Sequence, residues 1–301
     1  MRLLHAAQNG QLRTKPPGAL DIFKLNNSNI HLSDCSVSIV APPAATWDEI
    51  SLIQMNGSRP WDREASGDPP EPLTAMMDDL FVRGLGTIVR TTSTQARLSI
   101  ANSLIVGTGP LVHAFNTEAR QFAHQILDVR ITSSTIDIQQ PLLTVDCRPF
   151  DLRPVPMAVH LQSSAIATLS SVSAAAPLCF WSSPTTSSAI ADTLSFVGTG
   201  NVYIRRENGL MGKFSDGEVR TLVQTPADWS RQHLGEDSGS FYMKDLLGIV
   251  PGQWEQRTPK GYDLTSPMRK NSSQKDFEKM PGVSVRGIKS PRRLSMKDEK
   301  Q

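Results

Sequence analysis

Residues 98–115 of the chain read LSIANSLIVGTGPLVHAF, and residues 129–146 read VRITSSTIDIQQPLLTVD. The two stretches align without a gap over 18 residues, at an offset of 31 residues. Their matched positions are Leu98 with Val129, Ile100 with Ile131, Asn102-Ser103 with Ser133-Ser134, Ile105 with Ile136, and Pro110-Leu111 with Pro141-Leu142. Self-similarity at a period of this length indicates an array of stacked structural repeats.

Two further segments carry the first half of the same frame, which is apolar-x-apolar-x-[Asn/Ser]-Ser-x-apolar. Residues 159–166 read VHLQSSAI and follow the second copy at an offset of 30 residues. Residues 23–30, near the start of the chain, read FKLNNSNI. The repeat is therefore expected to extend beyond the two best-matched copies in both directions.

This frame predicts short strands separated by bends. Alternating apolar residues form a strand with one buried face. Asn and Ser favour bends because their side chains bond to the nearby backbone. One such unit is too small to bury its apolar face, whereas units stacked in register do bury it. Three short strands per unit predict an all-β fold, a right-handed parallel β-helix.

The offset also predicts the register of the stack. We expect Ile100, Ile131 and Leu161 to lie one over another and to point inward. The corner residues are expected to form a polar ladder, with Asn102 over Ser133 over Ser163. A strand pairing that placed any two of the three apolar residues in solvent would contradict this register.

The rest of the chain is organised around the stack. We predict an N-terminal extension over 1–19, the β-helix over 20–205 with a long polar loop near 56–73, a capping region over 206–255, and a disordered tail over 256–301. Residues 225–229 read TPADW, which is typical of a helix start with Pro at the first helical position, and this helix is expected to cover an open end of the stack. Asn116 is expected to cap another short helix that turns Phe122 and Ile126 inward.

Charge is distributed unevenly along the chain. The net charge is +2, yet residues 257–301 carry 12 Lys and Arg against 5 Asp and Glu. This tail has few large apolar residues, so it cannot bury enough apolar surface to offset its ordering entropy. It is expected to be solvated, without a specific partner. The alternatives are an electrostatic arm for nucleic acid or an anionic membrane, or a kinase site at Arg292-Arg293-Leu294-Ser295.

Composition excludes several classes of protein. Aromatic residues make up 6% of the chain, and 20 Gly and 21 Pro disfavour a helical bundle. No run approaches the roughly 18 apolar residues that a membrane span needs. The N-terminal MRLLHAAQNGQ is a poor signal peptide, so the compartment is taken as cytoplasmic by default.

Several short strings resemble the C-terminal part of large, mostly uncharacterised planctomycete proteins. These strings are FVRGLG at 81–86, PVPMAV at 154–159, NVY at 201–203, Trp229, and GED at 235–237. Some proteins of that group carry an N-terminal Ser/Thr protein kinase domain followed by a β-helix-like region. The resemblance covers roughly residues 20–240 and implies a β-helix module without implying any catalytic residue. It also suggests a shortened relative, or a late start within a longer gene.

The residues bear on two kinds of chemistry, protein-kinase activity and carbohydrate cleavage. A kinase is not indicated, because the chain has no Gly-rich loop, catalytic loop or DFG motif, and the short Gly198-Thr199-Gly200 is expected to be a turn. Glycoside cleavage needs a cluster of carboxylates. Asp137 and Asp146 lie on successive strands of one unit and have no acidic neighbours in register. The loop acids nearest in sequence, Asp128 and Asp151, are the expected helpers of a two-carboxylate centre. The pair Asp78-Asp79 is expected to form a turn.

Metal, thiol and aromatic sites are not indicated either. His113, Glu118 and His124 share one region, but their spacing fits no metal-ligand pattern. The three cysteines, Cys35, Cys147 and Cys179, show no CxxC spacing and are expected to be buried structural thiols. The five tryptophans, Trp47, Trp61, Trp181, Trp229 and Trp254, are expected to anchor core or loops, with a sugar-stacking platform as the alternative.

These observations predict no catalytic, cofactor-binding or metal-binding residue. The expected function is a non-enzymatic β-helix module that binds or scaffolds a protein or a polysaccharide. A carbohydrate-active β-helix enzyme, lyase or hydrolase, is the first alternative. The accessory region of a kinase-type protein that lacks its kinase domain is the second.

Overall fold

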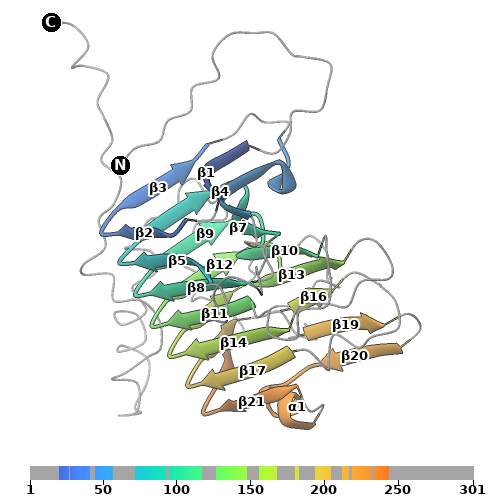
Figure 1. Cartoon of the computed structure of the whole chain (residues 1–301). Helices are drawn as coiled ribbons and strands as arrows, with labels where there is room; N and C mark the ends of the chain where they lie inside the picture. The colour runs from blue at the N-terminus through green and yellow to red at the C-terminus, as the bar shows by residue number, and fades with distance from the viewer. Residues whose placement is uncertain are drawn as a thin grey trace, which may run out of the picture.

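The chain folds into a parallel β-helix, in which three sheets run the length of a stack of rungs (Figure 1). The computed structural model describes residues 20–26, 28–40, 45–56, 72–92, 95–116, 127–147, 156–167, 180–182, 194–204, 212–216, 219–231 and 234–243. The predicted extension over 1–19, the helix after Asn116 and the basic tail lie outside these residues, as does most of the predicted loop. The β-helix predicted from the repeat is confirmed.

Three sheets make up the described part of the stack. Sheet A contains β1 (Leu20–Asn26), β4 (Ile50–Asn56), β7 (Thr87–Thr91), β10 (Val112–Asn116), β13 (Leu143–Cys147), β16 (Phe180–Ser182), β19 (Gly212–Asp216) and β20 (Val219–Val223), in that order. Sheet B contains β2 (Ile30–Ser33), β5 (Leu73–Asp78), β8 (Ala96–Ala101), β11 (Leu127–Thr132), β14 (Met157–Gln162), β17 (Leu194–Thr199) and β21 (Gly235–Ser238). Sheet C contains β3 (Ser36–Ile39), β6 (Phe81–Gly84), β9 (Leu104–Gly107), β12 (Thr135–Ile138), β15 (Ala165–Ala167), β18 (Val202–Ile204) and β22 (Phe241–Met243).

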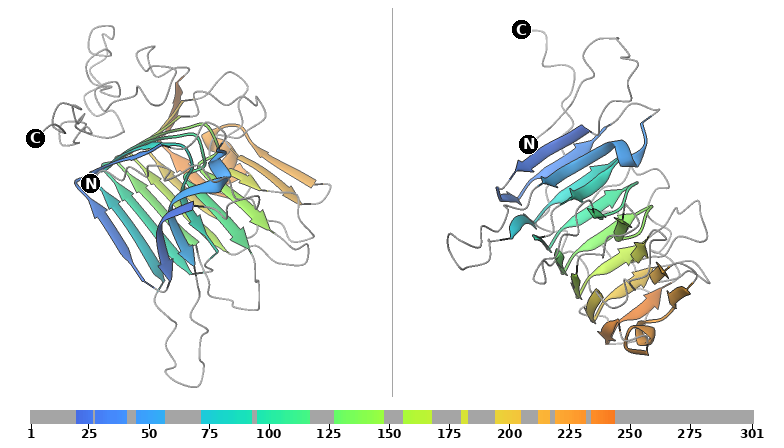
Figure 2. Two further views of the ribbon diagram at one scale, coloured as in Figure 1. Left: turned by 90° about the horizontal axis from the view of Figure 1, so that it is seen from above. Right: turned by 45° about the vertical axis from the view of Figure 1, so that its right-hand side comes forward.

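Each rung contributes one strand to each sheet, and equivalent strands of successive rungs pair in parallel. Figure 2 shows these strands lying one behind another along the stack. The exception among the described pairs is β19 with β20, which is antiparallel. A 3-10 turn, η1 (Trp47–Glu49), precedes β4, and a short helix, α1 (Pro226–Arg231), follows β20.

The predicted register is confirmed. Ile100 of β8 pairs with Ile131 of β11, which in turn pairs with Leu161 of β14. All three side chains are 1% exposed or less, and they point into the core. Full burial of a side chain of this size stabilises the fold by about 1.5–3 kcal/mol. The apolar ladders inside the three sheets therefore hold the stack together.

The corner between sheets B and C has one backbone conformation in every described rung. The residue at this corner has a positive φ of 43° to 67°, and it is Asp34, Asp79, Asn102, Ser133, Ser163, Gly200 or Gly239. This left-handed conformation is tolerated best by Gly and by Asn or Asp. The turn predicted at Asp78-Asp79 is confirmed only for Asp79, because Asp78 still belongs to β5. The turn predicted at 198–200 is confirmed only for Gly200, because Gly198 and Thr199 still belong to β17.

The hydrogen-bonded polar ladder lies one residue further along than predicted. It is formed not by Asn102, Ser133 and Ser163 but by the residues that follow them. Each ladder side chain accepts the backbone N–H of the preceding rung, in the series Leu80 to Ser103 (3.1 Å), Ser103 to Ser134 (3.1 Å), Ser134 to Ser164 (3.2 Å), Ser164 to Asn201 (3.0 Å) and Asn201 to Ser240 (2.9 Å). The corner residues instead turn the chain so that their successors point inward.

The first copy of the repeat was misaligned. Residues 23–26 of the segment FKLNNSNI belong to β1, which pairs with β4 in sheet A. The structural equivalents of Leu98 and Ile100 are Ile30 and Leu32 of β2, which connect to them through β5. Their corner is Asp34-Cys35, and Asp was not part of the predicted frame.

The stack continues beyond the rung that was predicted to be its last. β21 pairs in parallel with β17, and β22 pairs in parallel with β18. The predicted helix is confirmed as α1, and it packs against β21 at this end of the stack (Figure 1). Trp229 of α1 is fully buried and stacks on Phe196 of β17, with ring centroids 4.1 Å apart. The helix thus covers the open end of the core.

Candidate functional site

A pocket lies on the outer face of sheet B. Its volume is about 340 Å³, which falls within the usual range of ligand sites. Its lining includes Pro72, Gln95, Arg97, Asp128, Arg130 and His160. Three consecutive strands, β8, β11 and β14, supply its charged side chains. Arg97, Asp128, Arg130 and His160 thus lie together on the outer face of these three strands.

Strand pairing explains why these side chains meet. Arg97 pairs with Asp128, and Asp128 pairs with Ala158, so the three lie in one row across the sheet. Arg130 pairs with His160 in the next outward row. Adjacent strands lie about 4.8 Å apart, which brings neighbouring side chains within hydrogen-bond reach. Ala158 has a short side chain, which leaves room beside Asp128.

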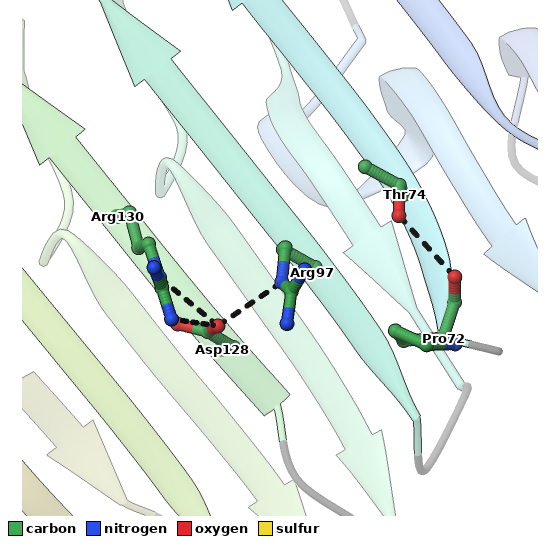
Figure 3. Close-up of polar contacts among 5 residues, drawn as sticks. All are labelled: Pro72, Thr74, Arg97, Asp128 and Arg130. Carbon is green, nitrogen blue, oxygen red and sulfur yellow. Dashed lines mark hydrogen bonds and ion pairs between the residues drawn. The ribbon is translucent and has the colours of Figure 1, made fainter. Parts of the chain in front are cut away.

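Asp128 is the centre of the polar contacts. Its Oδ2 accepts a hydrogen bond from Nε of Arg97 at 3.1 Å and forms an ion pair with Nη2 of Arg130 at 2.9 Å. Its Oδ1 accepts from Nε of Arg130 at 3.0 Å. Figure 3 shows the two guanidinium groups converging on this carboxylate. The hydrogen bond to Asp128 and its negative charge raise the pKa of Arg130.

Exposure separates the carboxylate from its partners. The Asp128 side chain is 12% exposed, whereas those of Arg97 and Arg130 are 47% and 53% exposed. Nearby, the hydroxyl of Thr74 donates to the carbonyl of Pro72 at 3.2 Å and holds the strand start beside the pocket (Figure 3). The carboxylate of Asp128 is therefore buried, whereas the two arginines that contact it remain exposed to solvent.

The carboxylates singled out in the sequence are divided among the three sheets. Asp137 is 1% exposed in β12 of sheet C, where it pairs with Val106 and Ala167. Asp146 lies in β13 of sheet A and pairs with Phe115. Asp128 lies in the sheet B pocket, and Asp151 lies outside the described residues. The described acids of this group therefore do not share one face.

Histidine and cysteine positions give no metal site within the described ranges. His113 is buried on the outer side of sheet A and contacts Trp47, with ring centroids 5.6 Å apart, while Glu118 and His124 lie outside those ranges. No three His, Cys, Asp or Glu side chains of the described residues come together as metal ligands do. Cys35 was expected to be buried and is only half-buried, and burial raises the pKa of its thiol. Cys147 ends β13, and Cys179 is not described.

Two of the tryptophans, Trp47 and Trp229, act as anchors. Trp229 fills the capped end of the core, and Trp47 packs beside His113. Trp181 lies on β16, while Trp61 and Trp254 fall outside the described residues. No helix in the described part of the chain is both long and apolar enough to cross a membrane.

Sequence reasoning did not single out Arg97, Arg130 and His160. The signal was present in the repeat alignment, because the offset of 31 residues places Arg97 opposite Asp128 and the offset of 30 places Arg130 opposite His160. The aligned apolar residues mark the inward positions of the strands, whereas Arg97, Arg130 and His160 occupy the outward positions between them.

Comparison with known proteins adds no family assignment. No protein-family model, curated protein or solved structure matches the chain. The resemblance to the β-helix-like region of planctomycete proteins therefore stays a prediction. Functional inference depends on the geometry of the chain itself.

Proposed function

We propose that the protein is a binding module that recognises a polysaccharide along the outer face of sheet B. The observation that carries this proposal is a row of exposed polar side chains in register on four successive strands. The row consists of Thr132, Gln162, Thr199 and Ser238. It runs beside the pocket, because Thr132 and Gln162 follow Arg130 and His160 at the next outward position of their strands.

The chemistry of this row suits sugars. Hydroxyl and amide groups both donate and accept hydrogen bonds, as sugar hydroxyls do. The side chains recur at the strand spacing of about 4.8 Å, so a long polymer with repeated hydroxyls can contact several rungs at once. Protein interfaces are centred on aromatic and aliphatic side chains instead. The polar row therefore favours a polysaccharide over a protein partner.

Binding without cleavage is the mode that we propose. A glycosidase places two carboxylates on either side of the scissile bond. Asp128 is engaged by two arginines, and Asp137 and Asp146 lie in the other two sheets. The geometry of the described acids thus supports a binding role and leaves the enzymatic alternative to experiment.

The test measures both binding and cleavage by the full chain. We expect saturable binding to at least one member of a polysaccharide panel, by calorimetry or co-sedimentation, with no new reducing or unsaturated ends. The double variant Gln162→Ala, Thr199→Ala is expected to weaken binding about tenfold, because two hydrogen bonds are removed. Thr144→Ala, on sheet A, serves as the matched control and is expected to bind normally.

Two outcomes would contradict the proposal. If no polysaccharide of the panel binds, the binding role is wrong. If chain ends accumulate and Asp137→Asn abolishes them, the enzymatic alternative replaces it.

A further inference from the structure

The pocket on sheet B presents more positive charge than its own carboxylate neutralises. Arg97 and Arg130 carry two positive charges, and Asp128 supplies one negative charge. His160 lines the same pocket from the next strand. A site with an excess of cationic donors on an exposed face is suited to an anion.

Asp128 fixes the direction of the two guanidinium groups. Both of its oxygens are engaged, Oδ1 by Arg130 and Oδ2 by both arginines. Arg97 makes its hydrogen bond to Asp128 through Nε and lines the pocket, so the two Nη groups of its guanidinium fork are not used in that hydrogen bond. Because long side chains lose entropy when a ligand orders them, a carboxylate that orders them beforehand favours binding.

Among the described residues, Arg97 and His160 have pocket donors without a protein acceptor. The contacts of Arg97 within the described part of the chain end at Asp128, and the ring of His160 makes no hydrogen bond there. A guanidinium group recognises planar carboxylates and tetrahedral oxyanions through paired N–H donors. The donors that face the pocket therefore match an acidic group of a ligand.

Building on the proposed polysaccharide-binding role, we infer that the pocket selects acidic polysaccharides. Arg97 and Arg130 bind the acidic group, a uronate carboxylate or a sulfate ester, and Asp128 is a positioning residue. His160 contacts the same group from the adjacent strand. The polar row of Thr132, Gln162, Thr199 and Ser238 then contacts the neighbouring sugars of the same polymer.

The experiment compares matched polymers with the full chain. A polyuronate is paired with its methyl ester, and dextran sulfate is paired with dextran, which separates carboxylate from sulfate recognition. We expect at least tenfold tighter binding to one acidic member than to its neutral partner. The variant Arg97→Gln, Arg130→Gln is expected to remove this preference, which is measured as the ratio of the affinities for the acidic and the neutral polymer.

Three controls address charge, geometry and folding. Lys24→Gln removes one positive charge on sheet A and is expected to retain the preference, which separates the pocket from a general effect of charge. Arg97→Lys keeps the charge without the fork and is expected to lose part of the preference. Asp128→Asn is expected to weaken binding, although it makes the chain more positive. Unfolding midpoints show whether each variant is folded.

Each outcome decides a separate point. If the double arginine variant folds and keeps the acidic preference, the pocket assignment is wrong. If acidic and neutral polymers bind equally well, selection by charge is wrong while the proposed polysaccharide-binding role stands. If no polymer binds, the proposed function fails and this inference fails with it. If Asp128→Asn binds more tightly, the positioning role is wrong.

Discussion

The backbone N–H of Ser103 donates to Oγ of Ser134, one rung further along the stack, over 3.1 Å. Ser134 Oγ in turn donates to the carbonyl of Thr132 at 2.8 Å, and both serines are fully buried. The hydroxyl therefore satisfies a backbone donor of one rung and a backbone acceptor of its own. Backbone hydrogen bonds between the rungs flank this position, from the N–H of Asn102 to the carbonyl of Thr132 and from the N–H of Thr135 to the carbonyl of Ser103. The serine bridge supplies the acceptor for the Ser103 N–H that lies between them.

Replacing Ser134 with Ala tests this bridge. The change leaves the buried N–H of Ser103 without its acceptor, and we expect the free energy of unfolding to fall by about 1–3 kcal/mol. Urea unfolding followed by circular dichroism measures the difference. Ser195→Ala removes the same hydroxyl from an exposed position of β17 and is expected to change the free energy by less than about 0.5 kcal/mol. Equal effects of the two substitutions would contradict a role for the bridge.

At the left-handed corner, by contrast, a smaller side chain is expected to preserve or raise the stability of the protein. Ser133 has a φ of 48°, and the equivalent corner residues of the last two rungs are Gly200 and Gly239. Ser133→Gly is expected to preserve or slightly raise stability, whereas Ser133→Val is expected to lower it by about 1–2 kcal/mol, since β-branched residues avoid this conformation.

A strand residue provides the comparison for the corner. Thr132→Gly, one residue earlier in β11, is expected to destabilise the protein, because Gly weakens a strand. Unfolding midpoints of the three variants rank them directly. A loss of stability in Ser133→Gly as large as in Thr132→Gly would show that the corner is not strained.

Much of the fold was predictable because inward positions repeat. Leu98, Val129 and Val159 occupy one inward ladder, and this regularity gave both the strand pattern and the register. The rung built from β21 was missed because its inward positions are Gly235 and Asp237, which show no apolar alternation. The first rung was misaligned because a corner needs a residue that tolerates positive φ, and Asp34 does so as well as Asn or Ser.

The candidate site was much less predictable. Outward positions face solvent, so no packing constraint makes them periodic, and single charges there carry little signal. The sequence predicts Asp128 to be a loop acid that assists Asp137 and Asp146, and this prediction is wrong: Asp128 lies in β11, where it contacts Arg97 and Arg130. A cluster of this kind can be predicted only if the strand register is also used to align the outward residues that lie between the apolar ones.

The capped end of the stack predicts a dependence of stability on acid. Burial acts to raise the pKa of Asp228, but hydrogen bonds from the backbone of Thr225 and Gln224 outweigh it and lower the pKa below its usual value. A carboxyl with a depressed folded pKa stabilises the protein above its unfolded pKa of about 3.9, and this stabilisation is lost as the pH falls through the folded pKa. Asp228→Asn is expected to be less stable at pH 7 and to lose less stability on acidification. Denaturation midpoints from pH 7 to pH 2 measure this, and parallel curves would contradict it.

A close approach of two rungs predicts a coupled pair. A Cβ at Gly198 would lie 2.5 Å from the carboxyl group of Asp237, which is held by the hydroxyl of Tyr203 at 2.7 Å and by that of Ser240. Gly198→Ala is therefore expected to destabilise the protein by about 1–3 kcal/mol through overpacking. In an Asp237→Ala background the same change is expected to have a much smaller effect. A double-mutant cycle of unfolding free energies measures the coupling between the two positions. Additive effects would show that the added Cβ at residue 198 does not clash with the carboxyl group of Asp237.

Asp237 itself predicts a pH dependence of the opposite sign to that of Asp228. Burial raises the pKa of Asp237 above its usual value, although the hydrogen bonds from Ser240 and Tyr203 counteract part of the shift. A carboxyl whose folded pKa is raised binds its proton more tightly in the folded state, so stability falls as the pH rises from the unfolded pKa of about 3.9 through the folded pKa. Asp237→Asn has nearly the same shape and no charge, and we expect it to remove this fall and to be at least as stable as the original chain at pH 7. Glu236→Gln, an exposed neighbour on β21, is the matched control and is expected to keep the original pH profile. An unchanged profile in Asp237→Asn would show that the carboxyl is solvated in the folded chain.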